Sequence, residues 1–257
     1  MEEEILELEQ LPNNVISYSQ VKMFKRCHYQ WYLRYKLGYK MKPRSNLVLG
    51  TGLDKGLKQG FLTKINEGGD DVKIRNIIID VAVTEIERIV ASEEVDWAEY
   101  DNVDILKDDV ARMGAKYYDE IGKKLFPEEI ARKFEMEFEG VEWKLVGEVD
   151  LVEKKLIDWK TRNRTRFDDM YFIFDEQLKL YKIIYPREVE IHGIIRQKRD
   201  VVLQVINVNI NENDIKEALE NVKNVVILMK TGIYYKKNDS QVCSWCGFRD
   251  ICQGRQL

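Results

Sequence analysis

The sequence predicts an α/β domain with a mixed β-sheet and a mainly helical N-terminal part. Apolar residues recur every three or four positions through the first half of the chain, and every second position from about residue 133. Helical spacing then returns between later strands. With 257 residues and 44% hydrophobic content, one sizeable core can form. We expect a single domain, in three parts: a helical part over 1–130, an α/β core over 131–232, and a cysteine-rich tail over 233–257.

Four helices are expected before the sheet. The first spans residues 17–37, where Ser17 and Gln20 fit a capping box and Gly38 a C-terminal stop. Its apolar stripe consists of Val21, Phe24, His28, Trp31 and Tyr35. Three further helical ranges follow: 47–64, 72–91 and 105–125.

The strands are expected to begin with a hairpin that turns at Glu139-Gly140. The return strand continues to Val152, and a short apolar strand over 156–161 follows a second turn. The remaining elements follow in order: a helix at 174–185, strands at 190–197 and 201–210, and a helix at 213–230.

Two carboxylates and one lysine stand out on neighbouring strands. Asp158 and Lys160 point to one face of their strand, and Trp159 points to the other. Asp150 precedes them on the adjacent strand, one turn away. An unpaired Asp158 would be costly to bury, whereas Mg²⁺ or Mn²⁺ bound to two carboxylates would offset that cost. Taken alone, however, the Asp-x-Lys pattern is more often a solvent-exposed ion pair.

The wider sequence pattern strengthens the interpretation of these residues as a metal-binding site. Gly147-x-x-Asp150, then Leu156-Ile157-Asp158-x-Lys160-Thr161, then Gln177-Leu178-x-x-Tyr181 together resemble the RecB-type branch of the PD-(D/E)XK nuclease superfamily. The resemblance implies a restriction-endonuclease-like fold and an Mg²⁺- or Mn²⁺-dependent deoxyribonuclease. It implies these roles: Asp150, Asp158 and the main-chain carbonyl of Trp159 as metal ligands, Lys160 as the catalytic lysine, Gln177 and Tyr181 as orienting groups, and Glu148 as an assisting carboxylate.

One motif departs from the family pattern. Many relatives carry a metal-binding histidine in a helix that begins Gly-Thr-x-x-His, and here the matching stretch ends at Asp54. Asp54 is therefore an expected metal ligand, because carboxylates bind Mg²⁺ and Mn²⁺ directly. The replacement is also compatible with lost activity. His28 and His192 lie elsewhere, and we expect ordinary core or surface roles for them.

All four cysteines are expected to form one site. Cys243, Cys246 and Cys252 lie close together near the C-terminus, and Cys27 lies in the first helix. Two disulfides are not expected in a cytoplasmic chain, and a redox pair would leave two cysteines unexplained. Spacing alone does not distinguish a zinc site from an iron–sulfur site.

The sequence around these cysteines resembles the iron–sulfur nucleases, which include AddB-type helicase–nucleases and the exonucleases of CRISPR adaptation (the fourth Cas family). The matching residues are Ser17-Tyr18-Ser19, Phe24, Cys27, Trp31 to Tyr35, and the stretch from Cys243 to Cys252. The resemblance covers about residues 16–254. It implies a four-iron four-sulfur cluster that joins the N- and C-terminal regions.

Local rather than overall charge predicts DNA binding. The net charge is −4, but a basic run follows the carboxylate motif. Arg162, Arg164 and Arg166 alternate along it and could follow a phosphate backbone. No apolar run is long enough to cross a bilayer, and the acidic N-terminus does not resemble a signal peptide, so we expect a cytoplasmic protein.

Three functional hypotheses follow. The first is an exonuclease acting on single-stranded DNA or DNA ends in processing, recombination or repair. The second is a catalytically inactive DNA-binding or scaffold member of the same fold, and the third is a zinc-stapled adaptor protein. No P-loop motif is present, so unwinding would require a partner such as a helicase, and a recombinase or integrase is also a candidate partner.

Overall fold

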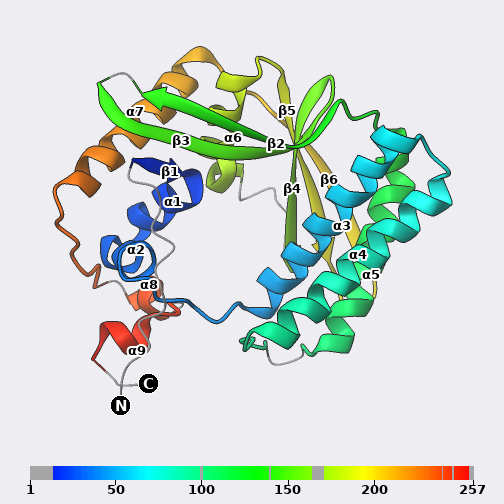
Figure 1. The fold of residues 1–257 in the computed structure, drawn as a ribbon, viewed down its shortest axis with the longest axis horizontal. Coiled ribbons are helices and arrows are strands. Elements are labelled where there is room, and N and C mark those ends of the chain that lie inside the picture. Colours follow the sequence, from blue (N-terminus) through cyan, green and yellow to red (C-terminus); the bar gives the residue numbers. More distant parts are fainter. Residues whose placement is uncertain are drawn as a thin grey trace. The chain divides into compact units, whose positions relative to one another are not determined.

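The computed structural model describes residues 14–98, 101–138, 140–163, 171–238, 240–244 and 246–254 (Figure 1). The chain forms two compact units. The first unit contains Met1–Met41, Lys133–Gly147 and Lys216–Leu257, and the second contains Lys42–Arg132 and Glu148–Ile215.

The second unit contains a mixed sheet. The end of β3 (Val141–Val152) pairs antiparallel with β4 (Lys155–Asn163), which pairs parallel with β5 (Glu188–Arg196) along its whole length. β5 then pairs antiparallel with β6 (Val201–Val208). This arrangement, flanked by helices, confirms the predicted mixed α/β fold.

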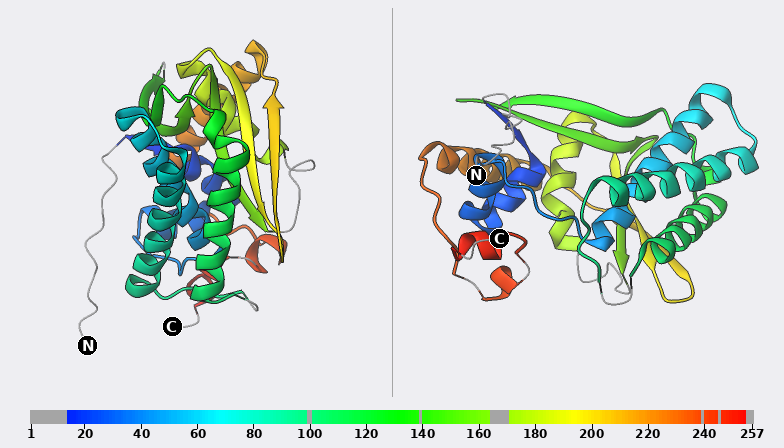
Figure 2. Two further views of the ribbon diagram at one scale, coloured as in Figure 1. Left: turned by 90° about the vertical axis from the view of Figure 1, so that its right-hand side faces the viewer. Right: turned by 60° about the horizontal axis from the view of Figure 1, so that its bottom comes forward.

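Helices cover both faces of this sheet. α3 (Ser45–Glu67) contacts β4, α5 (Val103–Glu120) contacts β5 and β6, and α4 (Asp71–Ser92) packs on α3 and α5 (Figures 1 and 2). α6 (Tyr171–Ile184) contacts β5 as well. Seven consecutive residues of β5 are buried, as expected for a strand covered on both sides.

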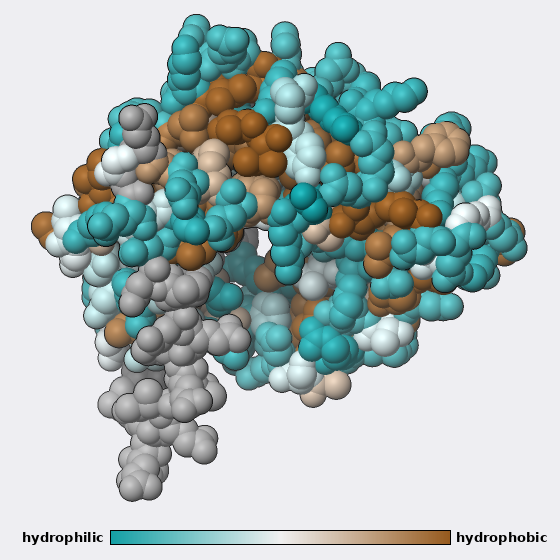
Figure 3. Space-filling view, turned by 45° about the horizontal axis from the view of Figure 1, so that its top comes forward, coloured by the Kyte–Doolittle hydropathy of each residue, from teal (hydrophilic) through white to brown (hydrophobic). Residues whose placement is uncertain are grey.

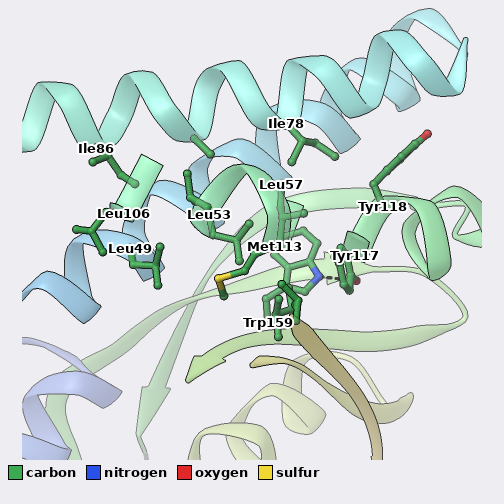
Figure 4. Packing of buried hydrophobic residues seen from close by; sticks show 14 of the residues in the cluster. Leu49, Leu53, Leu57, Ile78, Ile86, Leu106, Met113, Tyr117, Tyr118 and Trp159 are labelled. Atoms are coloured by element: carbon green, nitrogen blue, oxygen red, sulfur yellow. Dashed lines mark hydrogen bonds between the residues drawn. The ribbon is translucent and has the colours of Figure 1, made fainter. Parts of the chain in front are cut away.

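The main core of the second unit lies between α3, α4, α5 and the sheet (Figure 4). Glycines at four-residue spacing allow α3 to approach α4 closely. A Cβ atom at Gly56 would lie 2.4 Å from the main-chain oxygen of Ile78, which is far inside van der Waals contact. These helices confirm the ranges predicted at 47–64 and 72–91. The range predicted as 105–125 is α5 followed by a 3₁₀ turn, η1 (Gly122–Lys124).

The first unit combines the N-terminal elements with the last helices of the chain. β1 (Val15–Ser17) pairs parallel with the first part of β3, and β2 (Glu129–Phe138), which enters this unit at Lys133, also pairs with β3. The other elements are α1 (Tyr18–Arg26), α2 (His28–Tyr35), α7 (Glu212–Lys230), α8 (Ser240–Ser244) and α9 (Arg249–Cys252).

The first helix differs from the prediction. Residues 17–37 form two helices that are interrupted at Cys27, whose backbone is extended (φ −163°, ψ 117°). Ser17 makes no side-chain cap, so the predicted capping box is wrong. Its expected partner Gln20 is buried and accepts a hydrogen bond from Trp31 Nε1 at 3.3 Å instead. β1 was not predicted, because three residues carry too little periodicity.

The surface carries separate apolar patches among hydrophilic residues on the face drawn in Figure 3. Within the described part of the chain, no helix combines the length and the apolar character needed to span a membrane.

Candidate active site

The end of β3 and the start of β4 bring Asp150 beside Asp158. Leu151 pairs with Ile157 across the turn. Asp150 Oδ2 accepts a hydrogen bond from the main-chain N–H of Trp159 at 2.9 Å, so its carboxylate reaches across to β4. Strand alternation places Asp158 and Lys160 on the face of β4 opposite to Trp159.

Asp158 is a buried carboxylate with few partners. It is 1% exposed, and neither oxygen accepts a hydrogen bond of normal geometry from the described residues. Lys160 Nζ lies 2.5 Å from Asp158 Oδ2 and forms an ion pair with it. A buried carboxylate normally has several hydrogen-bond donors. The oxygens of Asp158 therefore retain unused capacity to bind a cation.

Burial and mutual repulsion perturb the charges of this group. Burial, with a further contribution from the charge of Asp158, raises the pKa of Asp150 to about 7. Burial alone would lower the pKa of Lys160, but the charges of Asp158 and Asp150 outweigh it and raise that pKa. Lys160 is thus held as an ammonium ion between two acidic groups.

Helix α3 contributes a second pair of charged groups. Lys58 Nζ donates to Asp54 Oδ2 at 2.7 Å and to Glu148 Oε1 at 2.8 Å, and lies 3.8 Å from Asp150 Oδ1. Burial raises the pKa of Asp54 even though Lys58 opposes that shift. Lys58 was not predicted from the sequence. Its position four residues after Asp54, on the same helix face, was the available signal.

Gly50 allows α3 to pack closely against β4. A Cβ atom at Gly50 would lie 2.8 Å from Thr161 Oγ1, immediately after Lys160 on β4. The second turn of α3 therefore packs tightly against β4. Asp54 and Lys58 follow one and two turns later, which directs them toward the carboxylates of β3.

Helix α6 holds Tyr181 and Gln177 beside the same strands. The Tyr181 hydroxyl donates to the main-chain carbonyl of Glu148 at 2.7 Å, and Gln177 Nε2 donates to the Tyr181 oxygen. Burial, followed by the charges of Asp158 and Asp150, raises the pKa of Tyr181 far above its usual value. Tyr181 therefore stays protonated and ties α6 to β3 just before Asp150.

A buried hydrogen-bond chain lies on the core side of β4. Trp159 Nε1 donates to the Tyr117 oxygen at 2.7 Å, as drawn in Figure 4, and Tyr117 lies 2.7 Å from His192 Nδ1. His192 Nε2 lies 3.3 Å from Glu190, which is ion-paired with Lys155. This network orients the Trp159 ring on the core side of β4. It gives His192, which is 2% exposed, a structural role in the core.

Because of this network, the stability of the fold should decrease as the pH becomes acidic. The hydrogen bond from His192, together with Lys155, lowers the pKa of Glu190 from 4.5 to about 2. The charged carboxylate therefore contributes fully above pH 4.5, and its contribution is lost as the pH falls toward 2. We expect Glu190→Gln to be less stable by about 1 kcal/mol at pH 7, since Lys155 is partly solvent-exposed, and the difference to shrink by pH 3.

Urea unfolding at pH 7, 4.5 and 3 measures this difference. Glu188→Gln is the matched control, because Glu188 lies on the same strand but its side chain is 79% exposed. A deficit in Glu190→Gln that stays constant across this pH range would contradict the assignment.

The predicted DNA-binding arginines are only partly described. Arg162 is half-buried at the end of β4, and burial lowers its pKa. Arg164 and Arg166 lie outside the described residues.

The four cysteines line one cavity in the first unit. Cys27 comes from the break between α1 and α2, and the other three come from the C-terminal segment around α8 and α9 (Figure 1). The cavity has a volume of about 40 Å³ and is also lined by Leu33 and Phe248. All four thiols are free and partly buried. Burial raises the pKa of Cys246 and of Cys252.

Neither the described carboxylates of the second unit nor the four cysteines of the first converge on one metal-binding point. Among the residues that the structure describes, no three histidine, cysteine, aspartate or glutamate side chains are arranged so that they could hold one metal ion. In the second unit, the reason is visible in the contacts. Asp54 and Glu148 are engaged by Lys58, which leaves Asp150 and Asp158 as the pair of neighbouring carboxylates.

Comparisons with known proteins identify the family. A model described as PD-(D/E)XK nuclease superfamily matches residues 15–253. A crystal structure from Eubacterium rectale, named "Putative exonuclease", has a TM-score of 0.63 at 13% identity, covering 95% of this chain and 89% of that chain. The crystal structure of SSO0001 has a TM-score of 0.45 at 12% identity, covering 96% and 89%. No curated protein matches the sequence. Because the family model spans nearly the whole chain, this protein belongs to the PD-(D/E)XK nuclease superfamily.

Proposed function

We propose that this nuclease is a divalent-metal-dependent deoxyribonuclease that acts as an exonuclease on single-stranded DNA or DNA ends. The observation that carries the proposal is the buried, under-coordinated Asp158 beside Asp150 and Lys160. A folded protein tolerates such a carboxylate when a ligand satisfies it in the working state.

The residues present fit Mg²⁺ or Mn²⁺. Asp150 and Asp158 provide carboxylate oxygens, which these hard cations prefer, and the main-chain carbonyl of Trp159 is a third proposed ligand. Asp54 Oδ2 already accepts a hydrogen bond from Lys58, which opposes the binding of the same ion by Asp54. When bound, the ion supplies Lewis-acid stabilisation of the phosphodiester and lowers the pKa of a water molecule.

The chain's own groups have distinct proposed roles. The Lys160 ammonium stabilises the negative charge that grows on the phosphoryl oxygens, or holds the attacking water. Tyr181 and Gln177 keep α6 and β3 together, so that Asp150 stays aligned with Asp158. Arg162, with Arg164 and Arg166, is proposed to bind the phosphate backbone. A partner helicase, recombinase or integrase would supply the DNA ends.

We further propose that the four cysteines hold a four-iron four-sulfur cluster. Two observations support this proposal. All four thiols line one cavity, and the sequence around them resembles the iron–sulfur nucleases, in which cysteine thiolates bind one cluster.

A cleavage assay with two lysine variants of β4 tests the proposed nuclease. We expect wild-type protein to degrade linear end-labelled single-stranded DNA with Mn²⁺ or Mg²⁺, to spare closed circles, and to stop in EDTA. Lys160→Met should reduce the rate at least about 100-fold, because it removes a charge at the reacting phosphate. Lys155→Met is the matched control, since Lys155 lies on the same strand and pairs with Glu190.

The possible outcomes are distinct. Cleavage of closed circles would make the protein an endonuclease. Equal cleavage rates in folded Lys160→Met and Lys155→Met would disprove the assigned site. Absence of cleavage by folded wild-type protein with either metal would favour the catalytically inactive member of the family.

A further inference from the structure

Lys58 bridges three carboxylates of the candidate active site. Its ammonium group lies 2.7 Å from Asp54 Oδ2, 2.8 Å from Glu148 Oε1 and 3.8 Å from Asp150 Oδ1. The Lys58 side chain is 23% exposed, so these contacts are made in a partly desolvated site. The Lys58 ammonium therefore supplies, from the protein itself, a positive charge that a metal ion could otherwise supply.

The charged groups divide into two pairs of carboxylates. Asp54 and Glu148 share Lys58, whereas Asp158 pairs with Lys160 and lies beside Asp150. With all four carboxylates ionised, the two ammonium groups leave two negative charges. One divalent cation balances them, and a second divalent cation would make the site positive before any substrate arrives.

The positions of the oxygens indicate where that one ion fits. Neither oxygen of Asp158 accepts a hydrogen bond of normal geometry from the described residues, although the Lys160 ammonium lies 2.5 Å from Oδ2. Asp150 Oδ1 lies beyond hydrogen-bonding distance of Lys58, so it remains available for an ion. In contrast, Asp54 Oδ2 and Glu148 Oε1 both accept a hydrogen bond from the one Lys58 ammonium group. A second ion would need these oxygens, since paired ions in two-metal sites lie roughly 3.5–4 Å apart.

We propose that Lys58 occupies the second cation position of this site, so that the nuclease binds one divalent ion and not two. This inference rests on the proposed metal-dependent function. Lys58 is a positioning residue here: it neutralises Asp54 and Glu148, keeps them from drawing in another ion, and leaves the bound ion to Asp150 and Asp158.

Calcium titration of the metal-free full-length protein tests the stoichiometry. Isothermal titration calorimetry should give one ion for wild type, after subtraction of the Asp158→Asn background from ions bound elsewhere. Lys58→Met should bind two, because Asp54 and Glu148 are released. Lys58→Arg, which keeps the charge, should bind one. Lys55→Met is the matched control on the same helix, since Lys55 pairs with Glu85, and it should also bind one.

A second measurement needs no variant and remains decisive if Lys58→Met does not fold. With excess Mn²⁺, electron paramagnetic resonance of wild-type protein should show an isolated ion at this site. A spin-coupled Mn²⁺ pair overturns the inference, as does one bound ion in folded Lys58→Met. In both cases the proposed function stands if Lys160→Met still abolishes cleavage. Failure of the wild type to bind any ion at Asp158 overturns the inference and the proposed metal dependence together.

Discussion

Asp158→Asn is expected to lose phosphodiester cleavage by a factor on the order of 10³ while folding at least as stably as wild type in EDTA. Asparagine has the same shape as aspartate but lacks the charge. Asp158 is buried, lies beside Asp150, and has Lys160 as its ion-pair partner. Replacing it therefore removes the repulsion between the two carboxylates and leaves Asp150 to balance Lys160.

The stability difference should reverse when metal is added. In EDTA, Asp158→Asn should be more stable by about 1–3 kcal/mol, since an under-coordinated buried charge is removed. In saturating Mg²⁺ the wild type should become the more stable protein, because an ion that binds only the folded state adds to its free energy of unfolding. Urea unfolding in EDTA and in Mg²⁺, together with the cleavage rate, measures both effects.

Asp200→Asn is the control for this experiment. Asp200 lies in the turn before β6, and its side chain is 69% exposed. It should change neither the cleavage rate nor the response to Mg²⁺. Strong destabilisation of Asp158→Asn in EDTA would instead make Asp158 a structural partner of Lys160, and wild-type cleavage would exclude it from the chemistry.

Cys27→Ser is expected to lose the iron of the proposed cluster and to destabilise the first unit severely. Cys27 lies between α1 and α2, and its three partners follow near the C-terminus of the chain. Linking them closes a very long loop, and the entropy saved is worth roughly 5 kcal/mol for a segment of this length. The bonds to the cluster add further free energy, because a bound metal centre couples to folding.

Iron and sulfide analysis of anaerobically purified protein, together with thermal unfolding and limited proteolysis, measures this loss. Ser244→Ala is the matched control, because Ser244 follows Cys243 directly and its side chain is exposed. It should retain full iron content and stability. Zinc in place of iron would identify the third hypothesis, a zinc-bound staple. Wild-type stability in Cys27→Ser would show that the cysteines have no joint structural role.

The sequence predicted most elements of the fold because their periodicity is local. The predicted helices α3, α4, α6 and α7 and the predicted strands β4, β5 and β6 are confirmed by the structure to within a few residues. The PD-(D/E)XK nuclease superfamily inferred from the Asp150, Asp158 and Lys160 motif is confirmed by a family model that spans residues 15–253, whereas the RecB-type branch stays a prediction. The metal, the DNA substrate and the iron–sulfur cluster remain predictions that the experiments above test.

Other features were missed because they depend on packing rather than pattern. The helical stripe over 17–37 hides the break at Cys27, since a single extended residue barely changes the spacing of apolar positions. Gln20 resembled a capping residue but is buried against Trp31. The chain from Trp159 through Tyr117 to His192 joins residues that no local pattern connects.

By itself, the sequence determined which residues of β3 and β4 face the same way, because strand geometry fixes alternation wherever the chain is extended. That is why the spacing of Asp158 and Lys160 was sufficient to pair them. Only the tertiary structure decided which residues of other elements lie close to them. Lys58 reaches Glu148, a residue 90 positions away, because Gly50 allows α3 to pack closely on Thr161. Contacts of this kind follow from the fit of whole elements, which the spacing of residues along one element does not encode.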